Sequence, residues 1–291
     1  MVYVLFNDYA GHSQEENKKK IRDMFPGEEV VFSDVVTVDD KMSYLQQVGE
    51  DDKVVIMGGD GTLNHFVNAI DETRWEFPIY CYAGGTGNDF LNDVAGSDDK
   101  LVQINDYIYN LPTVEVNGET YKFLNGIGYG IDGYACEIGD KVKKAGKNPN
   151  YTIIALKGLL GAFTPCHAKV TVDGVTEEYD NVWLAPTMHG RYFGGGMMIA
   201  PNQDRRNPEN TLSIVVASCK SRLRLLTIFP KIFKGAHLKY EKYVKVRTGK
   251  SVSIEFDTPC ALQIDGETIL GVESYKAYAC APKEEKEPAT V

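Results

Sequence analysis

The chain has no long apolar run and no basic leader. Its longest apolar stretch, residues 151–163, is interrupted by Lys157 and two glycines, and it is shorter than the roughly 20 residues needed to cross a bilayer. Residues 1–8 (MVYVLFND) lack the charged and apolar regions of a secretion signal. We therefore expect a first strand at residues 2–6, a mature protein that begins here, and a cytoplasmic protein without a transmembrane segment.

Patterns of metal ligands and disulfides are also missing. The six cysteines, at positions 81, 136, 166, 219, 260 and 280, form no C-x-x-C pair and lie mostly in apolar runs. Buried thiols of a reducing compartment have this distribution. The five histidines, at positions 12, 65, 167, 189 and 237, show no metal-ligand spacing. Zinc sites and disulfides are therefore not expected.

Positive charge is scarce, because 31 Lys and Arg stand against 41 Asp and Glu and the net charge is −10. This balance argues against general nucleic-acid binding. Residues 220–250 are the exception, with ten basic residues and one acid, so they carry +9 and the rest of the chain −19. Residues 222–234 mix cations with large apolar side chains, which favours an interfacial helix on anionic lipid. An ordinary helix packed on a sheet explains the pattern equally well, and Pro230 interrupts it.

The most informative feature present is a glycine turn after an apolar run. Residues 53–57 lead into Gly58-Gly59-Asp60-Gly61-Thr62. Glycines let main-chain N–H groups approach a polyphosphate, and a helix starting near Thr62 would offer its positive N-terminal end. The loop lacks the Gly-Lys-Ser/Thr end of a Walker motif and the G-x-G-x-x-G of a dinucleotide fingerprint. It therefore predicts nucleotide binding of another design, with an ordinary tight turn as the alternative.

The sequence pattern changes at about residue 110. Up to about residue 110, expected strands at 2–6, 30–32, 54–57 and 79–82 alternate with expected helices at 13–25, 39–48 and 63–70. This alternation predicts an α/β nucleotide-binding domain (1–110) with a parallel sheet and ligands at its carboxyl edge. Residues 111–282 show β-branched runs with Asn-Gly and Asp-Gly turns, which predict an antiparallel β-sandwich interrupted by helices near 151–160 and 223–234. Residues 283–291 are charged and predict a disordered tail.

Five segments, in order, resemble one kinase superfamily. The segment Gly58-Gly59-Asp60-Gly61-Thr62 resembles diacylglycerol kinase catalytic domains, sphingosine kinases, NAD kinases and phosphofructokinases. Residues 84–90 (GGTGNDF) resemble the G-T-x-N-D-[FL] element of bacterial diacylglycerol kinase-like lipid kinases, whereas NAD kinases have N-x-G-x-x-G-F-L. Residues 7–11, 194–201 and 263–267 resemble the family's N-P-x-[SA]-G, G-G-G-x-x-x-A-P and Q-x-D-G-E segments. The resemblance covers nearly the whole chain.

This resemblance implies ATP and Mg²⁺ as ligands. Asp60 would hold the metal directly or through water, and Asp89 would share it or cap the following helix. Asp8 replaces the family's usual proline, and a plain turn is the alternative role for Thr37. The nucleotide contacts implied are Asn7, Asp8, Tyr9, Ala10, Gly11, Thr37, Gly58, Gly59, Asp60, Gly61, Thr62, Leu63, Asn64, Thr86 and Asn88.

Phosphoryl transfer to an alcohol needs a carboxylate that takes the hydroxyl proton. Asp265 and Glu267 are candidates, because they flank Gly266 and could point to one side of an extended segment. The resemblance implies that Glu267 is the proton acceptor and that Asp265 lies beside the metal, whereas in sphingosine kinases the acid matching Asp60 is thought to act. The three catalytic roles could therefore be exchanged. A hairpin turn with a solvated Glu267 is the structural alternative.

Two further sites are implied by the resemblance. Residues 125–133 resemble the family's N-x-x-G-x-G-x-D-A segment, so Asp132 would contact the polar head of the lipid; a glycine corner between strands is the alternative. The family's structural metal binds a D-D-G loop, which residues 207–211 replace here after an insertion. An unoccupied loop is the alternative. The candidate ligands are Glu209 with the carbonyls of Arg206 and Thr211, or Asp204.

The leading hypothesis is an ATP-dependent lipid kinase that acts on diacylglycerol or a similar lipid at the membrane surface. Residues 151–163 could wall an apolar slot for that lipid. One alternative is a kinase of NAD or of a soluble alcohol, which shares the first glycine block. Another is a nucleotide- or lipid-binding protein without turnover, against which Asp60, Asp265 and Glu267 argue. A homodimer is compatible with the sequence, and no motif encodes the identity of the lipid.

Overall fold

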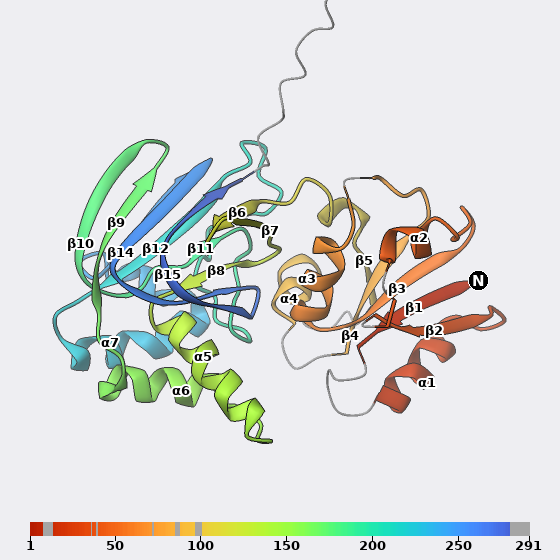
Figure 1. The fold of residues 1–291 in the computed structure, drawn as a ribbon, viewed down its shortest axis with the longest axis horizontal. Helices are drawn as coiled ribbons and strands as arrows, with labels where there is room; N and C mark the ends of the chain where they lie inside the picture. The colour runs from red at the N-terminus through yellow and green to blue at the C-terminus, as the bar shows by residue number, and fades with distance from the viewer. Residues whose placement is uncertain are drawn as a thin grey trace, which may run out of the picture.

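Two domains lie side by side in the fold (Figure 1). The computed structural model describes residues 1–7, 14–35, 37–38, 40–71, 73–84, 88–96 and 101–279. The first domain is built on a five-stranded sheet and the second on a ten-stranded sheet. Strands up to residue 103 belong to the first sheet, and strands from residue 113 belong to the second.

The first sheet has the strand order β2-β1-β3-β4-β5. Its strands are β1 (Val2–Phe6), β2 (Val30–Asp34), β3 (Lys53–Gly58), β4 (Ile79–Ala83) and β5 (Leu101–Gln103). The first four are parallel, and β5 is antiparallel to β4. Parallel neighbours need crossover connections, which include α1 (Gln14–Met24), α2 (Lys41–Leu45) and α3 (Asp60–Asn68).

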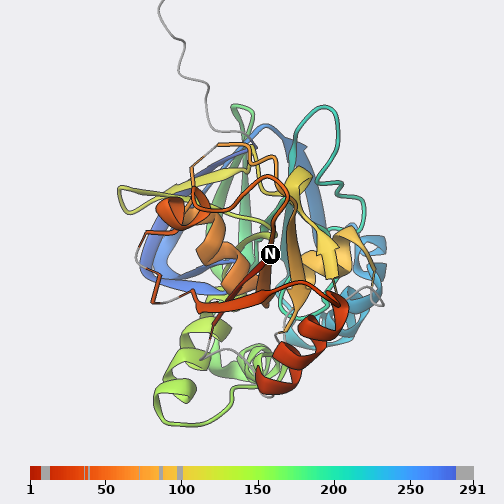
Figure 2. The same cartoon turned by 90° about the vertical axis from the view of Figure 1, so that its right-hand side faces the viewer.

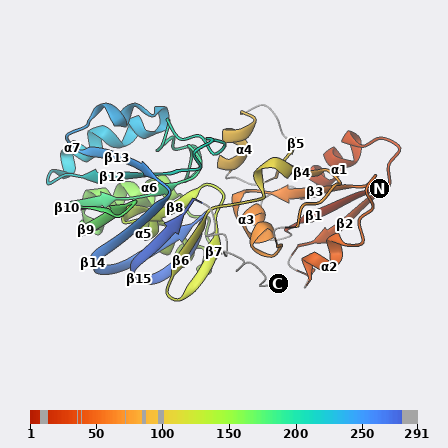
Figure 3. The same cartoon turned by 90° about the horizontal axis from the view of Figure 1, so that it is seen from above.

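Alternate side chains of these strands enter two apolar layers. Val4 and Val55 pack in one layer with Ile21 of α1. Leu5, the next residue of β1, packs in the other layer with Phe66 of α3, as the period of two requires. Figure 2 shows α1 on one side of the sheet and α2 and α3 on the other. The carboxyl end of β3 points toward the second domain (Figure 3).

The second sheet is antiparallel and follows the path β7-β6-β15-β14-β8-β11-β12-β10-β9. β14 also pairs with β9, which closes the path around a core that includes Tyr129, Val170 and Ile254, and β13 pairs with β12. The strands are β6 (Thr113–Val116), β7 (Glu119–Lys122), β8 (Gly126–Tyr129), β9 (Cys166–Val172), β10 (Val175–Leu184), β11 (Thr187–Met188), β12 (Leu212–Ser218), β13 (Val244–Gly249), β14 (Ser251–Ile264) and β15 (Glu267–Tyr278).

Helices cover the lower side of this sheet in Figure 1. Leu225 and Ile228 share an apolar cluster with Trp183 and Val215 of β10 and β12. Among the described residues, no helix combines the length and apolar character needed to span a membrane. The helical segments not yet given are α4 (Asp89–Val94), η1 (Asn105–Tyr107), α5 (Ile131–Lys144), α6 (Tyr151–Lys157), η2 (Gly158–Ala162), α7 (Arg222–Ile228), η3 (Phe229–Lys234) and η4 (Ala236–Lys239).

The predicted fold class, an α/β domain followed by an antiparallel β domain, is confirmed. The sequence did not predict α5, whose glycines obscure its helical periodicity. Gly133 faces β14 so closely that a Cβ there would collide with the carbonyl oxygen of Ala261, so the glycine serves packing. The longest strand of the second sheet is β14, which runs without a break from Ser251 to Ile264. Pro230 coincides with the change from α7 to η3.

Candidate active site

The turn between β3 and α3 brings a helix N-terminus to the domain boundary. Gly58 ends β3, and α3 begins at Asp60, two residues earlier than expected. A Cβ on Gly58 would collide with Oγ1 of Thr62, so glycine allows the first turn of α3 to fold against the strand. A Cβ on Gly61 would lie 3.7 Å from Oε1 of Glu267. The start of α3 therefore faces a carboxylate of the second domain.

Asp60 fixes the beginning of α4. Its Oδ2 accepts the backbone N–H of Asp89 at 2.9 Å, and its Oδ1 accepts the backbone N–H of Phe90 at 2.9 Å. Oδ1 also accepts the side-chain amide of Asn125 at 3.1 Å. A carboxylate has about four acceptor positions, so these three donors leave room for one ligand on Oδ2. Asp60 thus connects the N-termini of α3 and α4 to Asn125 of the second domain.

Asp89 is held by the glycine loop of the second domain. Its Oδ2 accepts the N–H of Gly195 at 2.8 Å, and its Oδ1 accepts the N–H of Gly196 at 2.6 Å. Burial and the nearby charge of Asp60 together raise the pKa of Asp89 to about 6. A cation beside these two acids would favour the charged form of Asp89. Two of the sequence motifs therefore meet at this carboxylate.

Asp265 is saturated by donors and buried. Its Oδ1 accepts the N–H groups of Asn125 at 2.8 Å and Gly126 at 3.0 Å. Its Oδ2 accepts the N–H of Leu124 at 2.5 Å and the side-chain amide of Asn64 at 2.8 Å. All of its roughly four acceptor positions are occupied. This geometry favours a positioning role for Asp265 over the role of proton acceptor.

The turn after Asp265 is supported by Gln263. Asp265 has φ 47° and Gly266 has φ 98°, the left-handed pair of a tight hairpin turn. Oε1 of Gln263 accepts the N–H of Gly266 at 2.6 Å, and its Nε2 donates to Oδ2 of Asp132 at 2.8 Å. Burial raises the pKa of Asp132 to about 7. The hairpin turn expected as the structural alternative is therefore present. The buried Asp132 supports this turn through its hydrogen bond with Gln263.

Glu267 is the carboxylate that this arrangement leaves exposed. It is the first residue of β15 and follows the supported turn directly. Within the described part of the chain, its carboxylate makes no hydrogen bond and no ion pair. Its Oε1 faces the first turn of α3 at Gly61. The geometry therefore separates Glu267 from Asp60 and Asp265, whose oxygens already accept backbone donors.

The other predicted nucleotide residues are distributed unevenly. Asn7 follows β1, and its carbonyl accepts Nε2 of Gln14 at 2.9 Å. Thr37 is exposed and donates its hydroxyl to the carbonyl of Asp34 at 3.0 Å, which matches the plain-turn alternative. Asp8, Tyr9, Ala10, Gly11 and Thr86 lie outside the described residues.

Residues near the two helix starts have mainly structural contacts. Gly59 is the N-cap residue of α3 and Asn88 that of α4. Thr62 and Leu63 are buried in the first turn of α3. Asn64 directs its amide to Asp265 and, at 3.3 Å, to the carbonyl of Lys122. Asn64 therefore links the domains instead of facing the glycine turn.

Asp60 and Asp89 fit a magnesium ion bound together with phosphate. The two acids are close enough for Asp60 to raise the pKa of Asp89, and each keeps acceptor positions beyond its backbone donors. Carboxylate oxygens with several waters are the usual surroundings of Mg²⁺. These residues would hold the ion, which would neutralise charge on the phosphates.

The loop at residues 204–211 does not fit the structural metal. The side-chain amide of Asn207 closes it by donating to the carbonyls of Asp204 at 2.6 Å and Thr211 at 3.4 Å. The Thr211 carbonyl also accepts Nε2 of Gln203 at 2.8 Å. The carbonyls of Asp204 and Thr211 are therefore already occupied by side-chain amides.

No other ligand set compensates for this closure. The side chain of Glu209 is exposed, and Oδ1 of Asp204 accepts the N–H of Arg206 at 2.9 Å. Across the described ranges, no group of three or more His, Cys, Asp or Glu side chains could hold a metal. The geometry thus gives no support to the expectation that Arg206, Glu209 and Thr211 bind a metal.

Sequence reasoning missed a buried ion pair beside the site. Nη2 of Arg205 lies 2.6 Å from Oδ2 of Asp93, and both side chains are only 5% exposed. Asp93 follows Asp89 by one helical turn on α4, which is a local signal. Arg205 lies 112 residues further along the chain, so no local pattern connects it to α4.

The fold and the site together define a kinase-type architecture. A parallel sheet ends in a glycine turn and a helix N-terminus, and an antiparallel β domain brings the exposed Glu267 to that helix. The sequence segments that resemble kinases lie along this boundary: residues 58–62, 88–90, 194–196 and 263–267.

Comparisons with known proteins identify the family. The profile described as "Diacylglycerol kinase catalytic domain" matches residues 1–112, and the one described as "YegS C-terminal NAD kinase beta sandwich-like domain" matches residues 125–283. The chain therefore belongs to the diacylglycerol kinase family whose members carry the YegS-type C-terminal domain. This is a family of lipid kinases.

Individual relatives agree with this assignment. A protein named diacylglycerol kinase from Mycobacterium tuberculosis is 27% identical over 212 residues, covering 70% of this chain and 67% of its own length. YtlR of Bacillus subtilis, named provisionally as a lipid kinase, is 23% identical over 243 residues, or 77% of this chain and 76% of its own. A Bacillus anthracis crystal structure, named provisionally as a diacylglycerol kinase, has the same fold, with a TM-score of 0.67, 19% identity, and coverage of 97% and 95%.

Proposed function

We propose that the protein is an ATP-dependent kinase that transfers the γ-phosphoryl group to a hydroxyl of diacylglycerol or a similar lipid. The observation that carries this proposal is the contrast between Glu267 and the other acids. Asp60, Asp89 and Asp265 accept backbone N–H groups, whereas Glu267 faces the start of α3. A helix N-terminus opposite an unused base suits phosphoryl transfer to an alcohol.

Each residue has a separate task in this proposal. The β3–α3 turn binds phosphate through its main chain, and Asp60 with Asp89 holds Mg²⁺, which stabilises charge on the transferred group. Glu267 takes the proton of the lipid hydroxyl while the new O–P bond forms. Asp265 and the Asp132–Gln263 pair keep the β14–β15 turn in position. Asp60 is less available than Glu267 to take this proton, because its carboxylate already accepts three hydrogen bonds.

We further propose that the basic segment contacts anionic lipid. Arg224 and Lys234 are exposed, next to the exposed Leu223 (76%) and Phe233 (39%) of α7 and η3. Exposed cations beside large apolar side chains favour an interfacial surface. Arg222 is different, because its Nη1 donates to the carbonyl of Leu159 at 3.3 Å and to that of Phe163 at 3.2 Å. The membrane-facing cations are therefore those of residues 224–234.

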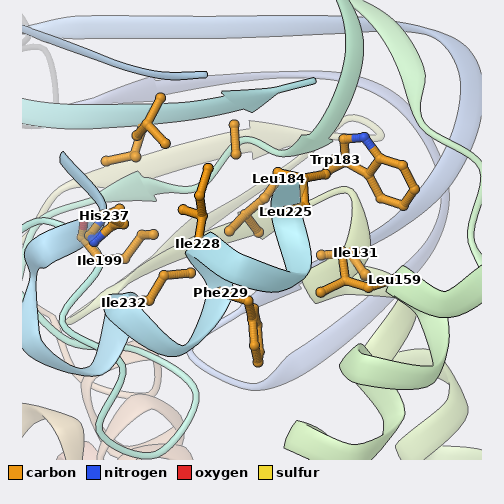
Figure 4. A pocket seen from close by; sticks show the side chains of 13 residues that line it. Ile131, Leu159, Trp183, Leu184, Ile199, Leu225, Ile228, Phe229, Ile232 and His237 are labelled. Atoms are coloured by element: carbon orange, nitrogen blue, oxygen red, sulfur yellow. Dashed lines mark hydrogen bonds between the residues drawn. The ribbon is translucent and has the colours of Figure 1, made fainter. Parts of the chain in front are cut away.

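An apolar cavity lies under the same helical segments (Figure 4). It has a volume of about 40 Å³, and α7 and η3 cover it with Leu225, Ile228 and Ile232. Leu159, from the segment expected to wall a lipid slot, lines one end next to Ile131 of α5. We propose that the cavity accepts part of an acyl chain when α7 moves outward.

The test is a phosphorylation assay with labelled ATP and Mg²⁺. Diacylglycerol in mixed micelles is compared with NAD and with glycerol, and a lipid extract is screened with mass identification of the product. Label in phosphatidic acid or another lipid is expected. Label only in a nucleotide or in a soluble alcohol would replace this proposal with the first alternative. Nucleotide binding without turnover on any acceptor would replace it with the second.

A further inference from the structure

A buried arginine links the two domains beside the candidate site. Arg205 lies in the loop before β12, and its side chain is 5% exposed. Its Nε donates to Oδ2 of Asp93 at 2.7 Å, and its guanidinium carbon lies 4.9 Å from the centre of the Phe90 ring. Both partners belong to α4, which Figure 3 shows next to this loop. A side chain of the second domain therefore holds α4 of the first.

The same guanidinium orients a partner of Asp60. Its Nη2 donates to Oδ1 of Asn125 at 3.0 Å, and its Nη1 donates to the carbonyl of Leu124 at 3.1 Å. The amide nitrogen of Asn125 in turn donates to Oδ1 of Asp60 at 3.1 Å. A carboxamide is planar, so the bond to its oxygen also fixes the direction of its N–H groups. Arg205 thus positions a donor to Asp60 as well as the helix that Asp60 caps.

Arg191 supplies further donors to Asp93, the carboxylate that Arg205 contacts. Arg191 donates from Nε to Oδ1 of Asp93 at 2.5 Å and from Nη2 to the Asp93 carbonyl at 2.9 Å. A Cβ on Gly190 would collide with Nη2 of Arg205, so the backbone approaches the cluster closely. A buried carboxylate between two arginines with complete hydrogen bonding is stable only as a unit.

The surroundings of the cluster disfavour a divalent cation. The adjoining polar cavity of about 310 Å³ is lined by three arginines and two aspartates: Arg191, Arg205, Arg206, Asp93 and Asp204. This excess of positive charge repels a second cation. In the same loop, the carbonyl of Asp204 accepts the side-chain amide of Asn207, and the carbonyl of Thr211 accepts that of Gln203. The guanidinium of Arg205 is the buried cation at this place.

We infer that Arg205 takes over, in this chain, the structural role that the resemblance assigns to a metal in the neighbouring loop. Arg205 is then a positioning residue that holds α4 and Asn125 against Asp60 without a bound ion. The claim about metal independence stands apart from the proposed function. The claim about Asp60 rests on that function, because it takes Asp60 as part of the nucleotide site.

Metal independence is tested on the full chain without nucleotide. Thermal unfolding is recorded in excess EDTA and in millimolar Mg²⁺, and the purified protein is analysed for bound metals. We expect the same midpoint in both buffers and no metal at a level close to one per chain. A retained metal near that level, whose removal lowers the midpoint, would overturn the inference.

The positioning role is tested by ADP binding in the presence of Mg²⁺. Arg205→Lys keeps the charge but cannot form the forked contact with Asp93 and Asn125, so its affinity for ADP should fall about tenfold or more. The affinity of Arg205→Ala for ADP should fall further. It should recover when millimolar guanidinium is added, but not when methylammonium is added. Arg74→Ala is the control, because Arg74 is an exposed arginine over the ring of Tyr109, and it should bind ADP normally.

The outcomes separate this inference from the proposed function. Normal ADP affinity in Arg205→Lys, or a folded Arg205→Ala protein that guanidinium cannot rescue, would refute the positioning role. If the wild-type protein binds ADP but phosphorylates no lipid, the proposed function fails and the inference stands. If it does not bind ADP at all, the positioning role fails with the proposed function, and the EDTA comparison still decides the metal claim.

Discussion

Nδ2 of Asn64 donates a 2.8 Å hydrogen bond to Oδ2 of Asp265, although 201 positions separate the two residues in the chain. The bond connects the middle of α3 to the turn between β14 and β15. Asn68, one helical turn later, adds a second link, because its Oδ1 accepts the N–H of Lys122 at 2.8 Å. The helix that follows the glycine turn is therefore attached directly to the domain that carries Glu267.

Asp265→Asn should destabilise the protein strongly. An amide at this position would turn an N–H group toward backbone donors of residues 124–126, so the free energy of unfolding should fall by about 3 kcal/mol. Urea denaturation measures this change. Asp173→Asn is a matched control, because Asp173 also has a left-handed φ of 48° and accepts the N–H of Ser251 at 2.8 Å, but it is exposed. An equal loss in both variants would contradict the special role of Asp265.

Glu267→Gln should remove catalysis without unfolding the protein. Because the carboxylate of Glu267 is exposed and has no hydrogen-bond partner among the described residues, stability and ADP binding should remain near the wild-type values. Loss of a general base should lower kcat by about 10² to 10⁴. Lipid phosphorylation is compared with that of Glu273→Gln, an exposed residue of the same strand. A kcat within a factor of about 2 of the control would argue for another base.

Asp132 should make stability depend on pH. Its pKa of about 7 in the folded protein exceeds the value of about 3.9 in an unfolded chain, so the folded state holds the proton more tightly. The stability from this group is complete below about pH 4 and is lost as the pH rises through 7. Asp132→Asn should therefore reduce the loss between pH 4 and pH 8 by on the order of 2 kcal/mol. Urea denaturation across this range checks it, and parallel curves for both proteins would reject the assignment.

Membrane binding should depend on α7 and η3. Replacing Arg224, Lys231 and Lys234 with Gln should weaken sedimentation with vesicles of phosphatidylglycerol and phosphatidylcholine, and higher salt should weaken wild-type binding too. Replacing Lys19 and Lys20 of α1 removes charge far from this surface and should have little effect. If vesicle binding changes neither with salt nor with the first set of substitutions, this surface does not bind the membrane.

The cavity under α7 predicts a selective effect of chain length. Ala217 lines the cavity, and Ala217→Leu would fill part of its volume of about 40 Å³. The kcat/KM for dioleoylglycerol should fall several-fold more than that for dihexanoylglycerol, because only the long chain reaches the cavity. Micelle assays with both lipids measure the ratio. An unchanged ratio in a folded variant would separate the cavity from substrate binding.

Local patterns predicted the four parallel strands of the first domain but not the antiparallel strand β5. Alternation of apolar runs and helices predicted the parallel strands, and Gly58, Asp60 and Gly61 identified the turn at the carboxyl end of β3 because glycine and one acid are readable without tertiary information. The Asp-Gly pair at 265–266 likewise suggested a hairpin turn, as the structural alternative to a catalytic role. These features depend on neighbours a few residues apart.

Long-range contacts were not readable from the sequence. Asp265 and Glu267 lie two residues apart and carry the same charge, and only the donors from residues 64 and 124–126 distinguish the buried acid from the exposed one. Nothing in the sequence around Arg205 distinguishes it from other loop arginines, because its partner Asp93 is distant in the chain. In both cases the partner comes from a different part of the chain, so spacing gives no indication of it.

The position of Glu267 has a consequence during synthesis. Glu267 is the first residue of β15, the last strand of the second sheet, and α3, which it faces, begins more than 200 residues earlier in the chain. A chain whose synthesis ends anywhere in between lacks the exposed acid. An incomplete product can therefore contain the whole of the first domain and still lack the acid that we propose as the general base.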